Sequence, residues 1–315
     1  MSKENYLITV IICTYNRCDL LKSVMETLID QKLPPDYYEL IIVDNNSNDS
    51  TKEFVQKFTV QNSKYNIRYI LEPNQGLSHA RNRGWKEAKG EYVAYTDDDC
   101  KIPPEWLTVA KNTIEKYSPD VFGGPYFAFY LSDKPKWFKD EYGSHVQCAE
   151  FRELYSNEFL DGANMFFRCS ILEEMGGFDP NLGMKGKTIG YGEETALLLT
   201  IRERKPEYSI LYNPDLFVYH LVPAQKMNLA WNIKNKFKDG IFSAKIFATS
   251  SQQNASKFRA LLSGIISVFY LLFDVTFGLC LRDRHKYPFY QNYLYEHSLR
   301  LIAKLGNSIQ VLMNM

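Results

Sequence analysis

Three consecutive carboxylates, Asp97, Asp98 and Asp99, follow the apolar run 92–95 after a single threonine, Thr96. Such a run is typical of a short buried strand, so the acids should lie on the loop at its end. Like charges this close repel one another and need a counter-charge. Oxygen ligands suit a hard divalent cation such as Mn2+ or Mg2+, which also binds substrate phosphates. The cluster indicates a metal-diphosphate site, with a solvated acidic turn as the alternative.

A second pair of acids, Glu193 and Glu194, lies between the glycine-containing segment 190–192 and an apolar helical pattern. The helix dipole favours ionised carboxylates at a helix N-terminus, which suits a general base. The alternative is charge placement without chemistry. His220 ends another apolar run, and a histidine there is either structural or a ligand.

The elements that position these residues alternate regularly. Apolar runs at 8–13, 38–43 and 67–71 each precede a polar loop and then a helical pattern. Segment 50–53 matches a capping box that would open the second helix. This alternation predicts βαβ crossovers and an α/β fold with a mainly parallel sheet.

Ligands of such sheets bind beyond the carboxyl ends of the strands. Segment 14–17, Asp44 and the acidic triplet each follow a strand, so we expect them to converge on one edge. A nucleotide is the natural ligand there, with Asp44 accepting a hydrogen bond from the base or ribose. The alternative for Asp44 is an Asx-turn in a polar loop.

Composition narrows the partners and the compartment. The 315 residues carry 37 Lys plus Arg and 37 Asp plus Glu, so the global charge provides no field for nucleic acid. The six cysteines show no CxxC spacing, and the N-terminal residues lack the apolar core of a signal peptide. We therefore expect a cytoplasmic protein with reduced cysteines.

Seven motifs occur in the order and approximate spacing of family 2 glycosyltransferases. They are residues 10–17, 42–47, 74–84, 97–99, 162–164, 177–179 and 192–194. The chain strongly resembles that family over residues 1–225. The resemblance implies a Rossmann-like GT-A fold, with a mixed, mainly parallel sheet flanked by helices. It also implies inverting transfer from a nucleotide-diphosphate sugar, with UDP favoured, to a glycan or lipid-linked acceptor.

The resemblance also implies roles for residues around the donor. Thr14, Tyr15 and Arg17 would line the nucleoside pocket, Asp44 would bind the base, and Arg81 would contact the nucleotide.

The acids of the triplet match the family's DXD motif. Asp99 would be the metal ligand, while Asp97 and Asp98 would lie nearer the nucleotide sugar. His220 matches a histidine that completes metal or diphosphate binding. Glu194 would be the base, with Glu193 beside it, although the family usually has Glu-Asp at this motif.

Residues 226–315 read as a separate helical region. Segment 226–247 is a lysine-rich amphipathic helix that could bind an anionic membrane or pack on a core. Segment 261–281 is long enough to span a membrane, but Asp274 opposes a clean span. We favour a tail in or against the cytoplasmic leaflet over a span, with a dimerisation tail as a third alternative.

Two other functions compete with glycosyl transfer. A sugar nucleotidyltransferase would need a glycine-rich phosphate loop after the first strand, and segment 14–17 has no glycine. A non-catalytic glycan- or nucleotide-binding module would be expected to lose an acid, yet Asp97, Asp99 and Glu194 are all acidic. Segment 132–158 is expected to be a loop over the acceptor side.

Overall fold

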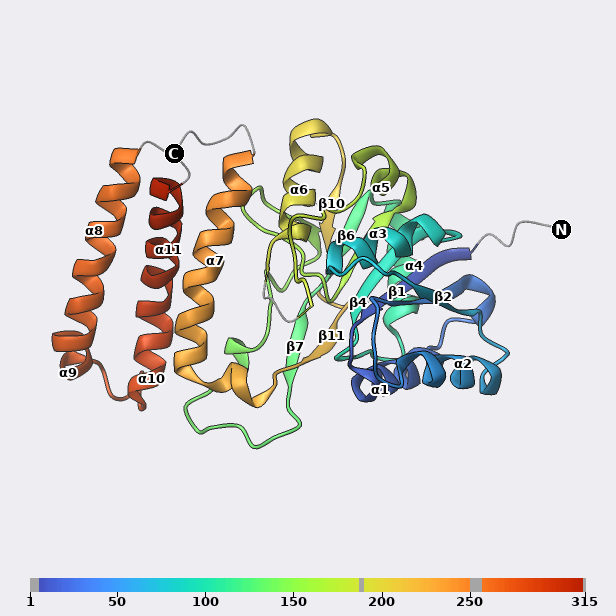
Figure 1. Ribbon diagram of the computed structural model, residues 1–315, viewed down its shortest axis with the longest axis horizontal. Coiled ribbons are helices and arrows are strands. Elements are labelled where there is room, and N and C mark those ends of the chain that lie inside the picture. Colours follow the sequence, from blue (N-terminus) through green and yellow to red (C-terminus); the bar gives the residue numbers. More distant parts are fainter. Residues whose placement is uncertain (1–5, 187–189, 250–256, 314–315) are drawn as a thin grey trace. The chain divides into compact units, whose positions relative to one another are not determined.

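The computed structural model describes residues 6–186, 190–249 and 257–313 (Figure 1). The chain forms two compact units. The sheet unit contains the described residues up to 129 and those in 143–221, and the helical unit contains residues 130–142 and the described residues from 222 onward. The functional boundary expected between residues 225 and 226 stays a prediction.

An eight-stranded sheet forms the centre of the sheet unit, in the order β3-β2-β1-β4-β9-β6-β10-β8. Its strands are β1 (Tyr6–Thr14), β2 (Tyr38–Asp44), β3 (Ile67–Leu71), β4 (Gly90–Asp97), β6 (Val121–Gly123), β8 (Arg152–Glu153), β9 (Met165–Arg168) and β10 (Ile210–Tyr212). Strands β1 to β4 pair in parallel, whereas β9 pairs antiparallel with both β4 and β6. The predicted mixed, mainly parallel sheet is confirmed.

Helices cover both faces of this sheet (Figure 1). They are α1 (Cys18–Ile29), α2 (Thr51–Gln61), α3 (Leu77–Glu87), α4 (Trp106–Tyr117), α5 (Cys169–Met175) and α6 (Glu193–Arg204). Alternate residues of a strand point to opposite faces. Val10 and Ile12 therefore share a core with α1, α2 and α4, while Ile11 shares one with α3, α5 and α6.

The strand register confirms the expected convergence at one edge of the sheet. Thr14, the last residue of β1, pairs with Asp44 of β2. Cys13 pairs with Asp97 at the end of β4. The loops after all three strands therefore start at the same level of the sheet.

A second, three-stranded sheet was not expected from the sequence. It consists of β5 (Cys100–Lys101), β11 (Val218–Leu221) and β7 (Tyr126–Phe129), in that order. Antiparallel pairing places His220 of β11 opposite Cys100, the residue after the acidic triplet. The small sheet therefore brings His220 to the acids from a distant part of the chain.

The capping box expected at 50–53 is wrong. Helix α2 begins at Thr51, and the side chain of Ser50 caps nothing. The backbone N–H and the hydroxyl of Thr51 instead donate to the Asp49 carboxylate, at 3.1 and 2.5 Å. Aspartate satisfies the open helix N–H groups as well as serine does, and here it also accepts from the backbone N–H of Cys18.

The helical unit is built mainly from the C-terminal part of the chain. It contains α7 (Leu229–Thr249), α8 (Lys257–Phe273), α9 (Leu279–Leu281), α10 (Tyr290–Tyr293) and α11 (Leu299–Met313). Helix α11 packs between α7 and α8 (Figure 1). At Gly306 an added Cβ would lie 2.1 Å from the Phe237 carbonyl oxygen, so only glycine allows this close approach to α7.

Helix α8 continues through a π-helical turn, Asp274–Gly278, into α9. The combined helix, Lys257–Leu281, is long and apolar enough to cross a membrane, by length and composition alone. Asp274, which weakened the case for a span, is buried and accepts hydrogen bonds from Tyr293 and Ser298, at 3.0 and 2.9 Å. Its polar atoms are therefore bonded inside the helical unit.

The expected acceptor-side loop at 132–158 is divided between the two units. Residues 130–142 belong to the helical unit, and the rest belong to the sheet unit. Tyr142 stacks on Tyr295, with 3.9 Å between the ring centroids, and Asn292 donates to the Trp137 carbonyl. The aromatic side chains of 130–142 therefore form part of the helical core.

Candidate active site

The middle acid of the triplet, Asp98, points into the protein. It is buried, and it accepts hydrogen bonds from Thr14 Oγ1 at 2.8 Å and from Arg17 Nη1 at 2.9 Å. Burial and the neighbouring Asp99 raise the pKa of Asp98 to about 7, although Arg17 and Thr14 act against the shift. Asp98 therefore ties the loop after β4 to the loop after β1, and its predicted role in donor binding stays a prediction.

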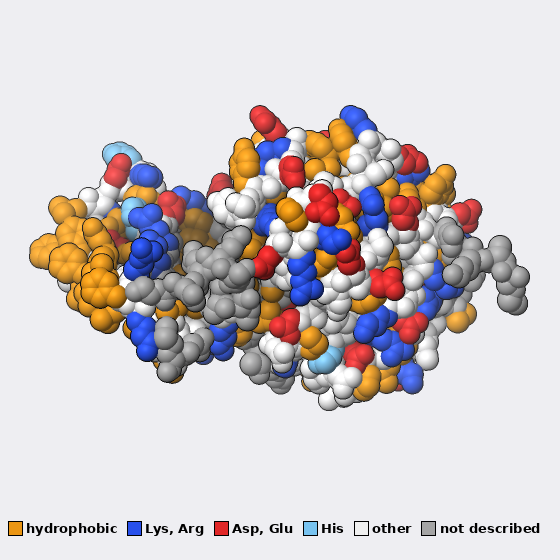
Figure 2. Space-filling view, turned by 90° about the horizontal axis from the view of Figure 1, so that it is seen from above, with side chains coloured by type: hydrophobic (Ala, Val, Ile, Leu, Met, Phe, Trp, Pro, Cys, Tyr) orange, Lys and Arg blue, Asp and Glu red, His pale blue; other side chains and the backbone are white. Residues whose placement is uncertain are grey.

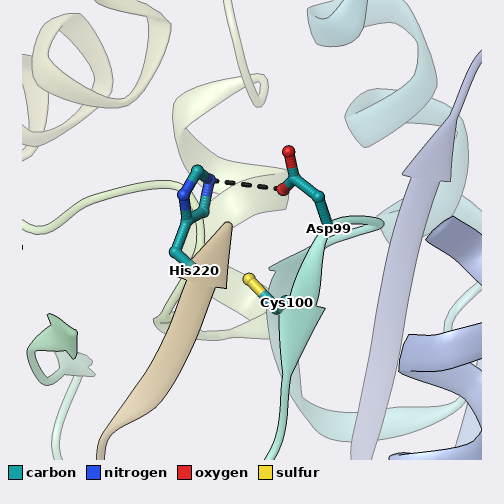
Figure 3. Close-up of side chains that lie close together, drawn as sticks. All are labelled: Asp99, Cys100 and His220. Carbon is teal, nitrogen blue, oxygen red and sulfur yellow. Dashed lines mark ion pairs between the residues drawn. The ribbon is translucent and has the colours of Figure 1, made fainter. Parts of the chain in front are cut away.

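The side chains of Asp97 and Asp99, the outer acids of the triplet, both lie close to His220. The imidazole Nε2 lies 3.3 Å from Asp99 Oδ1 (Figure 3) and 3.5 Å from Asp97 Oδ2. Burial alone would raise the pKa of Asp97, but the hydrogen bond and charge of His220 and the charges of Arg81 and Arg17 outweigh burial and lower it to about 2. Asp97 is thus ionised throughout the physiological range.

The acids and His220 fit a divalent cation. Asp99 Oδ1 is buried and accepts no hydrogen bond within the described residues. Native proteins rarely leave a buried carboxylate oxygen without a hydrogen bond. Ligand atoms of Asp99, Cys100 and His220 all lie within 4.8 Å of one another. Carboxylate oxygens are the ligands that suit Mn2+ or Mg2+.

Cys100 is a member of this cluster that sequence reasoning missed. Burial raises the pKa of its thiol well above the ordinary value, so the sulfur stays protonated. A protonated thiol is a poor ligand for a hard cation, since the thiolate is the form that binds metals. In the sequence, the position of Cys100 directly after the acidic triplet was the feature that could have identified it as a member of the cluster.

Arg81 connects the acidic triplet to the glutamate pair. Its guanidinium is buried and forms an ion pair of 2.8 Å with Glu193 Oε1, while Glu194 Oε2 and Asp97 Oδ1 each lie 3.9 Å away. A Cβ on Gly162 would lie 2.1 Å from Arg81 Nη2, so the glycine of motif 162–164 makes room for the guanidinium. The sequence indicated Arg81 as a nucleotide contact, which stays a prediction; its place between the two acidic groups was not foreseen.

Glu193 and Glu194 begin α6, directly after Gly192 at φ 91°. Their environments differ, because Glu193 is paired with Arg81 whereas Glu194 Oε2 is buried and accepts no hydrogen bond within the described chain. Burial and the charge of Glu193 raise the pKa of Glu194 well above its ordinary value, and Arg81 offsets only part of this. This upward shift opposes the effect of the helix N-terminus on Glu194, so the expectation that both acids are kept ionised stays a prediction.

The nucleoside side of the predicted site is held by the loops after β1 and β2. Asp44 is buried and accepts from the Ser47 backbone N–H at 2.9 Å and from the Tyr69 hydroxyl at 2.7 Å. Tyr15 lies on the neighbouring loop and is partly exposed. Arg17 extends from this loop to the acids and contacts Asp99 Oδ2 at 3.2 Å. The Asp44 carboxylate thus bonds to the backbone of its own loop three residues on, which is one residue beyond the Asx-turn given as its alternative, and the predicted convergence is present.

The chain matches known protein families and curated relatives. The family model described as Glycosyl transferase family 2 matches residues 9–176. The glucosyl-dolichyl phosphate glucuronosyltransferase of Haloferax volcanii is 25% identical over 83% of this chain and 84% of that protein. The succinoglycan biosynthesis protein ExoM of Rhizobium meliloti is 24% identical over 85% of this chain and 84% of its own length.

Solved structures share the fold. The mannosyltransferase PcManGT from Pyrobaculum calidifontis, in complex with GDP-Man and Mn2+, has a TM-score of 0.65 at 17% identity, over 98% of this chain and 87% of that one. TarS residues 1–349 from S. aureus, in complex with UDP-GlcNAc, has a TM-score of 0.56 at 19% identity, over 93% of this chain and 81% of that one. The GT-A-type fold expected from the sequence is confirmed.

Proposed function

Because the chain belongs to glycosyltransferase family 2, we propose that it moves a sugar from a nucleotide-diphosphate sugar to a hydroxyl of a glycan or lipid-linked saccharide. One observation supports this more than any other: buried Arg81 links Asp97 of the triplet to Glu193 and Glu194. The proposed donor-binding acid thus pairs with Nη2 of the same guanidinium whose Nη1 pairs with the two glutamates, one of them the proposed proton acceptor. Transfer to a hydroxyl needs both groups at one site.

The donor would bind at the ends of β1, β2 and β4. Thr14, Tyr15 and Arg17 would line the nucleoside pocket, and Asp44 would accept from the base. Because Ser47 and Tyr69 hold the Asp44 carboxylate in place, little side-chain freedom would be lost on binding. UDP is the favoured nucleotide.

Asp99 and His220 would hold Mn2+ or Mg2+, with Asp97 beside them toward the sugar. When bound, the cation would neutralise charge on the departing nucleoside diphosphate. Arg17 now pairs with Asp98 and Asp99, so it supplies the counter-charge that the sequence requires of this cluster. We propose that Arg17 turns toward the diphosphate when donor and cation are present.

Glu194 would act as the general base. Its raised pKa gives its carboxylate a higher proton affinity than an ordinary glutamate. The acceptor oxygen would bond to the anomeric carbon, its proton would pass to Glu194, and the carbon's bond to the diphosphate oxygen would break with both electrons leaving on the diphosphate. A single displacement from the opposite face inverts the configuration. Glu193, paired with Arg81, would hold the start of α6 in position.

The helical unit and the relatives support a proposal about the acceptor and its location. The relative from Haloferax volcanii is named for a glucosyl-dolichyl phosphate substrate, which is a lipid-linked saccharide. The combined helix Lys257–Leu281 is apolar enough to enter a bilayer. We therefore propose that the enzyme works at the cytoplasmic face of a membrane, on a lipid-linked or cell-surface glycan.

A donor screen tests the proposal. UDP-, GDP- and dTDP-sugars would be incubated with the full chain and Mn2+, and both binding and slow donor hydrolysis would be measured. We expect hydrolysis of one or more UDP-sugars that stops when the metal is chelated. No binding and no hydrolysis with any donor would contradict glycosyl transfer, while binding without turnover would favour a non-catalytic module.

A further inference from the structure

Helix α8 buries small or polar side chains and exposes large apolar ones, which is the reverse of a helix in a water-soluble protein. The residues that it and the following turn bury are small or polar: Ala260, Ser267 and Asp274 are spaced by seven residues, and Gly278 follows four residues later. The exposed residues are large and apolar: Phe258, Leu261, Leu262, Ile265, Ile266, Val268, Phe269, Tyr270, Leu272, Phe273, Val275, Phe277 and Leu281. A soluble helix buries its apolar stripe, whereas membrane helices pack through small residues and turn large ones to lipid.

This outer face is extensive. Phe269 and Leu272 are 68% and 62% exposed, and hydrophobic side chains gather at the α8 end of the helical unit in Figure 2. Soluble proteins rarely expose so continuous an apolar surface unless it binds a membrane or a partner. Lys and Arg side chains lie next to it (Figure 2).

Three of the basic residues line one groove between α8 and α11. Its volume is about 860 Å³. Arg259 comes from α8, while Arg300 and Lys304 lie one turn apart on α11. The walls of the groove are mainly apolar, and they include Leu262 and Ile266 from the exposed apolar side of α8.

The groove combines positive charge with hydrocarbon. Asp274 is the one acid among its lining residues, and Tyr293 and Ser298 already donate to its two oxygens. A second groove of the same helix pair, about 320 Å³ and lined by residues such as Leu261 and Ile309, contains no charged residue. Of the two grooves, only the larger is thus lined by cations, as binding of an anionic headgroup would require.

We propose that the groove between α8 and α11 binds the phosphate headgroup of an anionic glycerophospholipid, with an acyl chain along Leu262 and Ile266. The proposal rests on the membrane location given under Proposed function. Inorganic phosphate has no apolar part to match these walls. A membrane lipid presents both the phosphate and the chain, so it is the ligand that accounts for the whole surface.

The test compares charge-matched variants of the full chain. Arg300→Ala/Lys304→Ala removes two exposed cations of the groove, and Lys52→Ala/Lys57→Ala removes two exposed cations of α2. Each variant would be sedimented with phosphatidylcholine vesicles, with and without phosphatidylglycerol. We expect the groove variant to lose about 30-fold in affinity for phosphatidylglycerol vesicles, from roughly 1 kcal/mol per basic residue near an anionic surface. The α2 variant should bind like the original protein.

Two further measurements separate the possible sources of the effect. Ser263→Trp should fill the groove and weaken binding to phosphatidylglycerol vesicles without changing the charge. Inorganic phosphate, added at the same phosphate concentration as the lipid, should not displace the protein. An equal loss in both double variants, no loss in the groove variant, or displacement by inorganic phosphate would overturn the proposal.

Donor hydrolysis distinguishes this failure from failure of the proposed function. The groove variants should hydrolyse UDP-sugar in detergent like the original protein, because the substituted residues lie outside the sheet unit. Normal hydrolysis with unchanged vesicle binding would reject the lipid site alone. Absence of hydrolysis in every protein, including the original, would reject the enzyme activity and leave the vesicle result to be judged separately.

Discussion

At the scale of single residues, the two adjacent glutamates have different environments. Glu193 forms a buried ion pair with Arg81, whereas one carboxylate oxygen of Glu194 accepts no hydrogen bond from the part of the chain that the structure describes. An oxygen of Glu193 that already accepts from the Arg81 guanidinium is less available to take a proton from an acceptor hydroxyl. The structure therefore supports the sequence-based choice of Glu194 as the proton acceptor, which stays a prediction.

The Glu194→Gln variant should transfer sugar at least about 100-fold more slowly, while its affinity for the donor stays nearly unchanged. The reason is that a base acts only in the transition state. Turnover by product analysis and donor affinity by calorimetry measure the two effects. Glu193→Gln is the matched control: it should lower thermal stability, because it removes the closest partner of buried Arg81. Near-normal turnover in Glu194→Gln, with loss of turnover in Glu193→Gln, would reverse the assignment.

The dependence of kcat/KM on pH should reflect the raised pKa of Glu194. A protonated carboxyl cannot accept a proton, so activity rises with pH as Glu194 ionises. Because burial and Glu193 shift its pKa upward, this rise should occur at higher pH than an ordinary glutamate would give. Removing the charge of Glu193 lowers the pKa of Glu194, so Glu193→Gln should move the rise in kcat/KM to lower pH. An unmoved profile would exclude Glu194 as the titrating group.

Asp99→Asn should abolish the effect of Mn2+ on nucleotide binding. Of the triplet, Asp99 has a buried oxygen that accepts no hydrogen bond within the described residues, and His220 Nε2 lies 3.3 Å from that oxygen. Calorimetry with UDP, with and without Mn2+, measures the effect. We expect the original protein to bind UDP more tightly with metal and the variant to bind equally in both conditions. An unchanged metal effect in Asp99→Asn would contradict the predicted metal site.

At the scale of elements, local patterns predicted most of the sheet unit. Apolar runs followed by polar loops gave the strands that carry Thr14, Asp44 and Asp97, and the register confirms their shared edge. The wrong capping box at 50–53 shows the limit of such patterns: Asp49 and Ser50 can both cap α2, and contact with Cys18 favours Asp49.

Contacts between distant segments could not be predicted in the same way. The small sheet depends on pairing between Cys100 and His220, which lie far apart in the sequence. Arg81 reaches its central place because Gly162 leaves room for it and Glu193 pairs with it. A single sequence contains the motifs but not their contacts, so it named candidate residues, missed Cys100, and did not show how Arg81 connects the two acidic groups.

The reversed distribution of buried and exposed side chains on α8 leads to a prediction about the stability of the protein. In a soluble helix, polar substitutions are harmful on the buried side and tolerated on the exposed side. Here Ser267→Leu, on the buried side, should destabilise the protein by about 1–3 kcal/mol through overpacking. Leu272→Ser, on the exposed side, should leave unfolding in detergent unchanged and weaken vesicle binding. Thermal unfolding and vesicle flotation measure both. A stabilised Ser267→Leu variant would mean that α8 packs differently.

At the scale of the whole molecule, the two units do not correspond to two consecutive stretches of chain. Residues 130–142 leave the sheet unit, join the helical unit and return. Trp137 and Phe138 are buried there, and both contact the ring of Tyr295. A cut after the sheet unit therefore removes the partners of an internal segment that remains.

A protein truncated after Pro223 should consequently show more than the loss of membrane binding. Removing Tyr295 and Asn292 exposes Trp137 and Phe138, so we expect the tryptophan emission to shift to longer wavelength and the truncated protein to aggregate. Trp137→Phe in the truncated protein is the control, and it should remove the shifted emission. A soluble truncated protein with the emission of the full chain, after allowing for the loss of Trp231, would show that residues 130–142 fold with the sheet unit instead.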